Sequence, residues 1–216
     1  MHLIGHVGQL ISHWGLYAVF FVVLAESAGV PLPGETALVT AAIFAGQGKL
    51  SLPAVIATAT AAAVLGDNVG YWIGREFGFP LVLRYGGRIG LDEPRLKLGQ
   101  YMFRKHGGKI VFFGRFVAIL RTFAALLAGI NRLPWPEFLV FNALGGVTWA
   151  TLFATGGYML GKAFEHYARP VGIAALLLAV VGAFVVQRYL KAHADALMEE
   201  AQRAMPGPLV APKAGE

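Results

Sequence analysis

A short polar segment with two prolines interrupts the first strongly apolar stretch of the chain. The stretch 14–25 carries no charge and leads into Glu26–Glu35, ESAGVPLPGE, after which a second apolar stretch of ten residues follows. As helices the two stretches are about 18 Å and 15 Å long, whereas bilayer hydrocarbon is about 30 Å thick. Pro31 and Pro33 each remove a backbone donor, so a helix breaks there. The sequence therefore predicts a re-entrant hairpin over residues 13–47, which enters a membrane and returns to the same side.

The composition is that of an integral membrane protein. The 216 residues are 56% hydrophobic and only 14% charged, whereas soluble domains average about 25% charged residues. The chain has no cysteine, which excludes a disulfide, a thiolate nucleophile and a Cys-ligated metal site. The first basic residue is Lys49, so we expect no cleavable signal peptide.

Further apolar stretches predict a membrane domain over residues 13–191. Arg115 and Arg121 cut one of these stretches into pieces that are too short to cross a bilayer, which predicts a second re-entrant hairpin. The predicted segments are an interfacial lead-in at 1–12, a transmembrane helix at 52–74, a cytoplasmic loop at 75–109, the second hairpin at 110–131, transmembrane helices at 136–160 and 170–190, and a polar, partly disordered cytoplasmic tail at 192–216.

The loop at 75–109 holds most of the excess positive charge. It carries eight Lys and Arg residues against three acidic residues, so positive-inside orientation explains the net charge of +6 better than nucleic-acid binding does. Within the loop, Asp92-Glu93-Pro94 resembles a helix start and His106-Gly107-Gly108 a helix stop. An interfacial amphipathic helix and a solvated connector both fit this segment.

Two short motifs occur twice in the same order. The pattern A-G-x-x-[KR]-L-x-x-P occupies 45–53 and 128–136, and G-Y-x-x-G-[KR] occupies 70–75 and 157–162. Each half is then a hairpin followed by a spanning helix, and the two hairpins enter from opposite faces because one spanning helix separates them. The predicted fold is an all-α integral membrane protein with an inverted repeat of this kind and a C-terminal transmembrane helix. Transporters with inverted repeats bind substrate near the midplane; two generic loop-to-helix junctions are the alternative explanation.

Four charged residues of the hairpins are the candidate site. Glu26 and Glu35 lie on the first hairpin, and Arg115 and Arg121 lie on the second. If the tips meet, the charges compensate one another inside the membrane. The guanidinium groups would grip a phosphate bidentately, and the carboxylates would take up and release protons. A purely structural ion-pair network is the alternative.

Two further polar residues lie in the predicted spanning helices. Asp67 lies about two turns from the predicted end of its helix, where it either joins the substrate cavity or bonds a neighbouring helix. Asn142 is more often an interhelical hydrogen bond than a ligand, although it is a second candidate for the cavity. The six histidines fall at ends and in loops, so we expect no metal site and no cofactor.

The motifs of this chain resemble those of the DedA family, whose shared region is also called the VTT or SNARE-associated domain. The resemblance covers about residues 14–190. The resemblance rests on five motifs. They are E-S-x-x-x-P-L-P-G-E from Glu26, G-D-N-x-G-Y-x-x-G-R from Gly66, G-R-F-x-x-x-x-R-T from Gly114, Ala128-Gly129 and F-x-x-x-N-x-x-G-x-x-x-W from Phe138. The chain departs from the family at Ala118, where many members have proline.

The resemblance implies a bacterial inner-membrane, multi-pass protein. Some family members are implicated in recycling undecaprenyl phosphate, and eukaryotic relatives scramble phospholipids. The family's important acidic and basic positions match Glu26, Glu35, Arg115 and Arg121. We therefore expect a transporter that moves a lipid phosphate, either undecaprenyl phosphate or a phospholipid, with proton coupling.

Two other function classes compete with this expectation. A proton-coupled transporter of small cations or drugs, supporting membrane homeostasis, would use the same carboxylates. A lipid phosphatase would need a base to activate Ser27, and no histidine lies at that depth, so we expect no enzyme. The expected partners are membrane lipids and protons, without nucleic acid, and homo-oligomerisation is left open.

Overall fold

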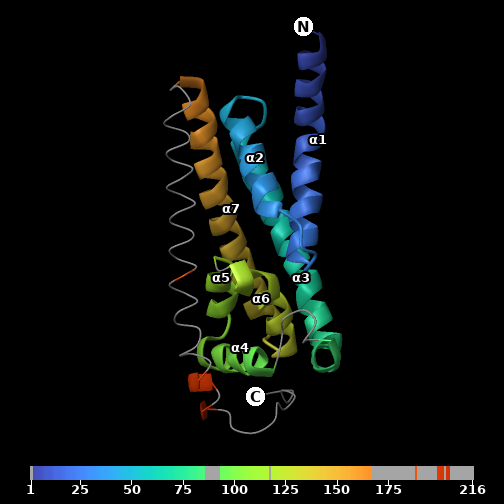
Figure 1. Ribbon diagram of the computed structural model, residues 1–216, viewed down its shortest axis with the longest axis vertical. Coiled ribbons are helices and arrows are strands. Elements are labelled where there is room, and N and C mark those ends of the chain that lie inside the picture. The colour runs from blue at the N-terminus through green and yellow to red at the C-terminus, as the bar shows by residue number, and fades with distance from the viewer. Residues whose placement is uncertain are drawn as a thin grey trace. The chain divides into compact units, whose positions relative to one another are not determined.

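The computed structural model describes residues 2–85, 93–116 and 118–166, together with 188, 199–201 and 203–204. The regular structure of these residues is entirely helical. The predicted transmembrane helix at 170–190 and most of the tail at 192–216 lie outside the described residues. The helices in chain order are α1 (His2–Ser27), α2 (Gly34–Gly46), α3 (Leu52–Tyr85), α4 (Glu93–His106), α5 (Lys109–Gly114), α6 (Ala118–Ile130) and α7 (Trp135–His166) (Figure 1).

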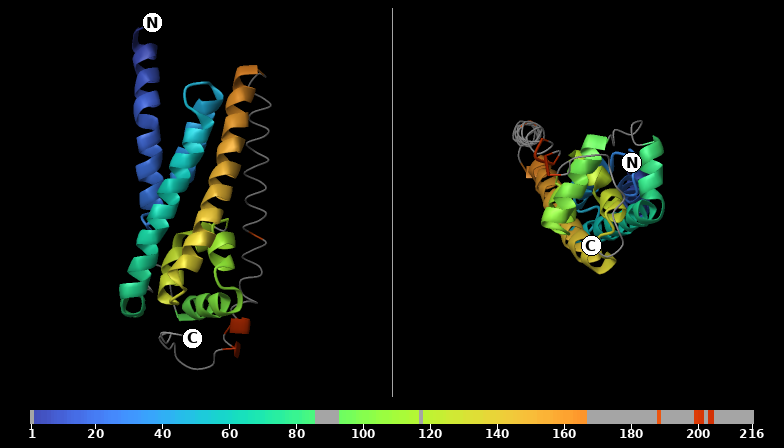
Figure 2. Two further views of the ribbon diagram at one scale, coloured as in Figure 1. Left: turned by 180° about the vertical axis from the view of Figure 1, so that it is seen from behind. Right: turned by 90° about the horizontal axis from the view of Figure 1, so that it is seen from below.

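The chain forms two compact units, to both of which α3 and α7 contribute. Unit 1 comprises Met1–Gly66 and Ala143–Val181, and unit 2 comprises Asp67–Asn142 and Gly182–Glu216. Viewed from behind, α3 and α7 are continuous helices (Figure 2). Each unit therefore combines a broken helical hairpin with one part of α3 and one part of α7.

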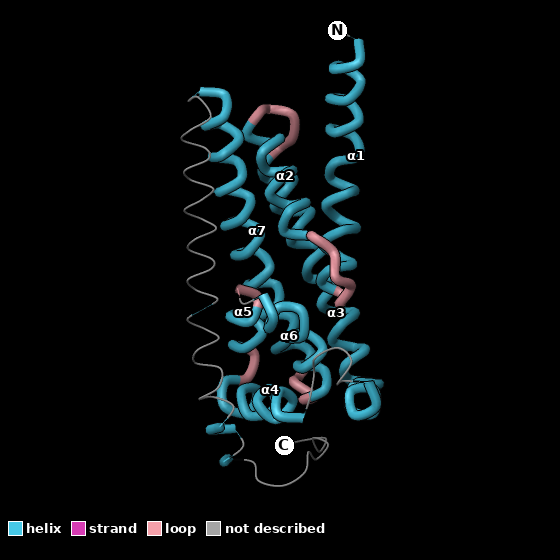
Figure 3. Tube along the Cα trace, in the orientation of Figure 1, coloured by secondary structure: helices cyan, strands magenta, loops and turns pink. Residues whose placement is uncertain are grey.

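In unit 1, α1 and α2 form the first hairpin, and residues 28–33 are the break between them (Figure 3). The end of α1 is a Schellman motif, because Gly29 has a φ of +105° and the N–H of Val30 bonds to the carbonyl of Ala25. Pro31 and Pro33 follow, so the helix cannot resume before Gly34. The predicted lead-in at 1–12 is not a separate segment, because α1 already begins at His2.

Small residues let α2 approach α7 closely in unit 1. A Cβ atom added to Gly157 would lie 2.9 Å from Cβ of Ala42 and 2.9 Å from the carbonyl oxygen of Val39. The surrounding core is apolar, with mostly aliphatic side chains and Trp149, and contains buried side chains from α1, α2, α3 and α7. Such contacts between small residues are the usual way in which helices associate in a membrane.

In unit 2, α5 and α6 form the second broken hairpin, with Arg115 and Phe116 in the turn after α5. The ring of Tyr71 on α3 stacks on Phe138 of α7, with ring centroids 4.4 Å apart. The hydroxyl of Tyr71 donates to the carbonyl of Leu133 at 2.6 Å. These contacts join α3, the α6–α7 turn and α7 into one core.

The segment between α3 and α5 contains a helix, α4, which spans Glu93–His106. The segment is therefore helical, while its position at a membrane interface stays a prediction. Its apolar side chains Leu96 and Phe103 are 5% and 6% exposed and belong to the core of unit 2. The apolar face of α4 thus packs against protein.

Both long helices extend beyond their predicted ends at 74 and 160. The apolar windows that are long enough to span a membrane are Leu52–Gly78 and Trp135–Lys162, but α3 continues to Tyr85 and α7 to His166. Arg75 and Glu76 are good helix formers, so the change in polarity does not end the helix. The helices therefore run past the predicted transmembrane segments, because helix propensity continues where hydrophobicity falls, while the membrane bounds at 74 and 160 stay predictions.

The two copies of the repeated motifs make equivalent contacts in the two units. In unit 2, a Cβ atom on Gly129 would collide with the backbone of Tyr71 and Arg75. In unit 1, a Cβ atom on Gly46 would collide with the backbone of Tyr158 and Lys162, which are the matching positions of the second motif.

The second glycine of each G-Y-x-x-G motif also makes equivalent contacts in the two units. Gly74 approaches the carbonyl of Leu126, and Gly161 approaches the carbonyl of Ile43. In each unit, therefore, the A-G motif of one half of the chain packs against the G-Y-x-x-G motif of the other half. This favours a true repeat over two generic junctions, while the insertion of the hairpins from opposite membrane faces stays a prediction.

Candidate functional site

A buried polar cluster lies at the break of the second hairpin. Nη2 of Arg115 makes an ion pair with Oδ2 of Asp67 and donates a hydrogen bond of 2.6 Å to Oδ1 of Asn142. The three residues are 5%, 7% and 0% exposed, respectively. They come from the turn after α5, from α3 and from α7, and all belong to unit 2.

Asp67 lies near the middle of the apolar window of α3. It is 15 residues after Leu52 and 11 residues before Gly78, which is roughly 22 Å and 16 Å along the helix. The prediction that placed it two turns from the helix end was wrong because α3 is longer than expected. A lone carboxylate at this depth is costly, and the positive charge of Arg115 compensates it.

The position of Arg115 depends on the short helix α5. The backbone N–H of Gly108, which precedes α5, donates to Oε1 of Glu137 in the first turn of α7 at 2.8 Å. α5 then ends at Gly114, and Arg115 follows directly in the turn. Glu137 therefore fixes the start of the segment whose end presents the guanidinium.

Arg121 lies one turn into α6 and is half-buried. It is close enough to Arg115 for the two positive charges to repel each other. The structure thus brings both predicted basic residues into one region of unit 2, together with the two polar residues Asp67 and Asn142.

The predicted acidic pair lies at the break of the first hairpin in unit 1. Glu26 is in the last turn of α1, Glu35 is in the first turn of α2, and both are half-buried. The carboxylate of Glu26 lies against Gly34, where an added Cβ atom would collide with it. The carboxylate of Glu35 is well placed for the positive end of the α2 dipole. Pairing of these acids with the arginines of the second hairpin stays a prediction.

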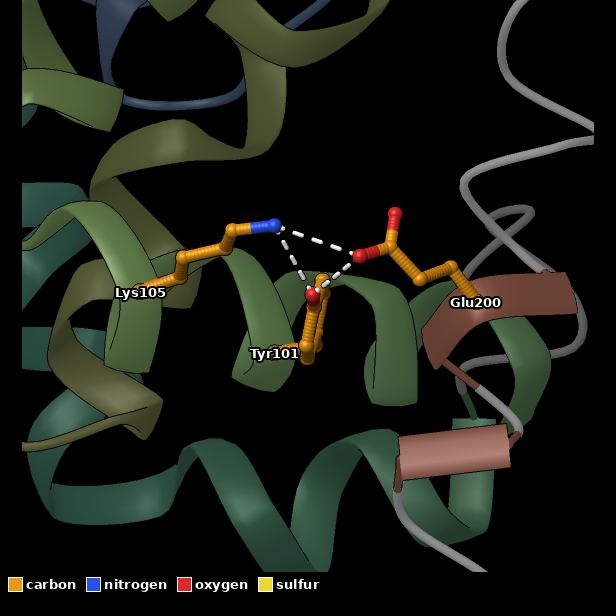
Figure 4. Close-up of polar contacts among 3 residues, drawn as sticks. All are labelled: Tyr101, Lys105 and Glu200. Atoms are coloured by element: carbon orange, nitrogen blue, oxygen red, sulfur yellow. Dashed lines mark hydrogen bonds and ion pairs between the residues drawn. The ribbon is translucent and has the colours of Figure 1, made fainter.

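An exposed polar cluster joins α4 to the tail in unit 2. The hydroxyl of Tyr101 donates to Oε1 of Glu200 at 2.6 Å, and Nζ of Lys105 donates to both, at 3.0 Å and 3.2 Å (Figure 4). The hydrogen bond from Tyr101 and the charge of Lys105 lower the pKa of Glu200, and the bonds to Tyr101 and Glu200 raise the pKa of Lys105. Sequence reasoning did not find this contact, since its members lie about 100 residues apart.

An apolar groove of about 650 Å³ follows the first half of α3 in unit 1. Eight side chains line it, and the hydroxyl oxygen of Thr60 is buried without a hydrogen-bond partner among the described residues. The lining residues are Leu52, Pro53, Ile56, Ala57, Thr60, Ala61, Val64 and Val147. In the described part of the chain, no three His, Asp or Glu side chains cluster as metal ligands would.

Comparison with known proteins shows the family to which the chain belongs. The family model of the VTT domain matches residues 32–159, which is more than half of the chain and includes Asp67, Arg115 and Asn142. The chain belongs to the DedA family of VTT-domain proteins. Glu26 lies just before the matched range, and Glu35 lies within it.

The relatives of this DedA-family protein include several named as membrane proteins. An uncharacterized membrane protein of Synechocystis sp. is 42% identical over 154 residues, which cover 71% of each chain. An uncharacterized membrane protein of Mycobacterium tuberculosis H37Rv is 37% identical over 183 residues, covering 83% of this chain and 84% of the relative. The protein DedA of Escherichia coli K12 is 32% identical over 194 residues, covering 86% and 85%. No solved structure matches the chain.

These names and the two apolar helices together identify a membrane protein. Sequence reasoning found Arg115 and Arg121 but left the roles of Asp67 and Asn142 open. The sequence feature that could have identified Asp67 is its position as an acidic residue in a helix that otherwise consists of apolar and small residues. Its pairing with Arg115 depends on how α3 and the second hairpin pack.

Proposed function

We propose that this DedA-family protein translocates a lipid phosphate across the bacterial inner membrane, coupled to proton movement. The observation that carries the proposal is the buried guanidinium of Arg115, which is 5% exposed at a helix break. Arginine keeps its charge at any relevant pH and grips phosphate bidentately. A permanent charge among apolar helices is expensive to maintain, which argues for a role in binding an anion.

The substrate class follows from this charge and from the apolar surroundings. A polyprenyl phosphate or a phospholipid combines a phosphate for Arg115 and Arg121 with a hydrocarbon chain. Glu26 and Glu35, beside the other helix break, are the groups proposed to take up and release protons. The protein acts in this proposal as a multi-pass transporter and catalyses no covalent step.

A proton-coupled transporter of small cations or drugs is the second candidate. It is favoured by the two half-buried carboxylates that flank the first break. It differs from the first candidate in one respect that can be tested. Loss of the arginines would leave cation transport intact, whereas conversion of Glu26 or Glu35 to Gln would abolish it.

The test is lipid movement in proteoliposomes that contain purified protein. Fluorescent undecaprenyl phosphate and the matching undecaprenol are compared by quenching from the outside. We expect the protein to accelerate movement of the phosphate lipid, and Arg115→Lys to slow it at least about tenfold, since a point charge lacks the bidentate fork. Glu76→Gln, which changes an exposed acid on α3, is the matched control. Equal movement by the wild type and by Arg115→Ala would contradict the proposal, and uptake of a labelled cation by Arg115→Ala would favour the alternative.

A further inference from the structure

We propose that Asp67 is the resident anion of the phosphate site, and that a lipid phosphate must displace it from Arg115 while Asp67 takes up a proton. This inference rests on the proposed function and adds to the proton-carrying carboxylates of the first hairpin a further one, Asp67, which acts when the phosphate binds.

Both hydrogen bonds of the Arg115 side chain come from one nitrogen. Nη2 donates to Asp67 and to Asn142, and no other described residue accepts from Nε or Nη1. A guanidinium offers two edges for a bidentate anion, the Nε–Nη2 edge and the Nη1–Nη2 edge. Because both edges include Nη2 and both of its hydrogens are used, a phosphate can form a two-pronged contact only if Asp67 or Asn142 leaves.

Of the two occupants, Asp67 is the one that a phosphate would replace. Asp67 and a phosphate are both anions and compete for the same cation, whereas the neutral Asn142 adds no charge to the competition. Among the described residues, none accepts a hydrogen bond from Nε or Nη1 of Arg115, although this side chain is only 5% exposed. The site therefore offers donors that a phosphate can use once it has replaced Asp67.

Displacement leaves Asp67 as a carboxylate near the middle of the apolar window of α3. The groups that face it from neighbouring elements of unit 2 are Arg115 and the neutral Asn142, while Arg121 of α6 repels Arg115. The nearest charged residues on its own helix, Arg75 and Glu76, lie two or more turns away. A buried carboxylate without a partner is costly, so Asp67 binds a proton from water as the phosphate arrives. It releases this proton when it pairs with Arg115 again after the lipid has left.

The proposal predicts proton uptake on binding, which calorimetry measures directly. The probe is farnesyl phosphate, a short polyprenyl monophosphate, titrated into the purified full-length protein in two buffers that differ in ionisation heat. We expect the wild type to take up about one proton per phosphate bound, and its affinity to fall as pH rises. Asp67→Asn should take up none and bind at least about tenfold tighter, because the competing charge is gone. Glu76→Gln should behave as the wild type does.

Asn142→Asp is a second variant that tests the same competition in the opposite direction. A second carboxylate at Nη2 should weaken binding of farnesyl phosphate at least about tenfold, and this result stands even if Asp67→Asn does not fold. Unchanged affinity in Asn142→Asp, or proton uptake that persists in Asp67→Asn, would overturn the role of Asp67 and leave the proposed function intact. Failure of the folded wild type to bind farnesyl phosphate at all would overturn both.

Discussion

The close contact between α2 and α7 leads to a prediction about two adjacent glycines. Gly157 is buried against α2, whereas Gly156 is exposed and an added Cβ atom would meet nothing within 4 Å. The substitutions Gly156→Ala and Gly157→Ala thus change the same helix, with the same chemistry, at neighbouring positions. Only the second one pushes two helices apart.

The magnitudes follow from the contacts. Replacing glycine by alanine in a helix adds about 1 kcal/mol of stability through propensity alone. At Gly157 the new Cβ atom would lie 2.9 Å from Cβ of Ala42 and 2.9 Å from the carbonyl oxygen of Val39, whereas carbon atoms prefer about 3.5–4.0 Å. Neither obstacle is the end of a flexible side chain, so overpacking should cost about 2–3 kcal/mol, in the upper part of its usual range. The net effect at Gly157 is a loss of about 1–2 kcal/mol, whereas Gly156→Ala gains up to about 1 kcal/mol.

The assay is thermal unfolding of both variants in the same detergent, followed by tryptophan fluorescence at one scan rate. A fixed rate matters because unfolding of such proteins is often irreversible. At about 2–4 °C per kcal/mol for a chain of this size, Gly157→Ala should unfold roughly 4–12 °C below Gly156→Ala. Equal unfolding temperatures, or a more stable Gly157→Ala, would show that α2 does not pack against α7 as described.

Two further predictions concern the repeat and the tail. Gly46→Ala and Gly129→Ala should lower the unfolding temperature by similar amounts, because each added methyl group meets the backbone of the facing helix; a loss at only one of them would speak against equivalent repeats. Tyr101→Phe should speed hydrogen exchange of the backbone around Glu200, since it removes the hydroxyl that bonds to Glu200 and Lys105. In the wild type this contact should be at full strength between the ordinary Glu pKa of 4.5 and the ordinary Lys pKa of 10.5. It should weaken as pH falls through the lowered pKa of Glu200, and again as pH rises through the raised pKa of Lys105. Protection of these amides, relative to their intrinsic exchange rate at each pH, that stays constant across both limits would refute it.

The helical segments and their breaks were largely readable from local chemistry. Proline and glycine act on the residues next to them, so the break at Pro31 and Pro33 could be placed before any packing was known. The same holds for α4, where the start at Glu93 and the stop at His106 follow from capping preferences. The helices α3 and α7 run past the predicted transmembrane segments because helix propensity continues past the point at which the apolar residues end.

The arrangement of the candidate site was only partly readable. Arg115 and the acidic residues could be identified from the sequence, because a charged side chain in an apolar membrane segment is energetically costly and usually functional. That Asp67 is the partner of Arg115 required the structure, because the two residues are 48 positions apart and meet only after α3 packs against the second hairpin. The crossed contacts between the repeated motifs depended on packing in the same way.

The sequence by itself determined that this is a helical membrane protein of the DedA family with broken hairpins and buried charges. These properties depend on composition and on neighbours along the chain, which a linear pattern records. Only the tertiary structure decided which buried charge compensates which, and which glycines touch which backbone. Two charges pair when packing brings them close together in space, and the order of residues along the chain does not specify the distances between helices.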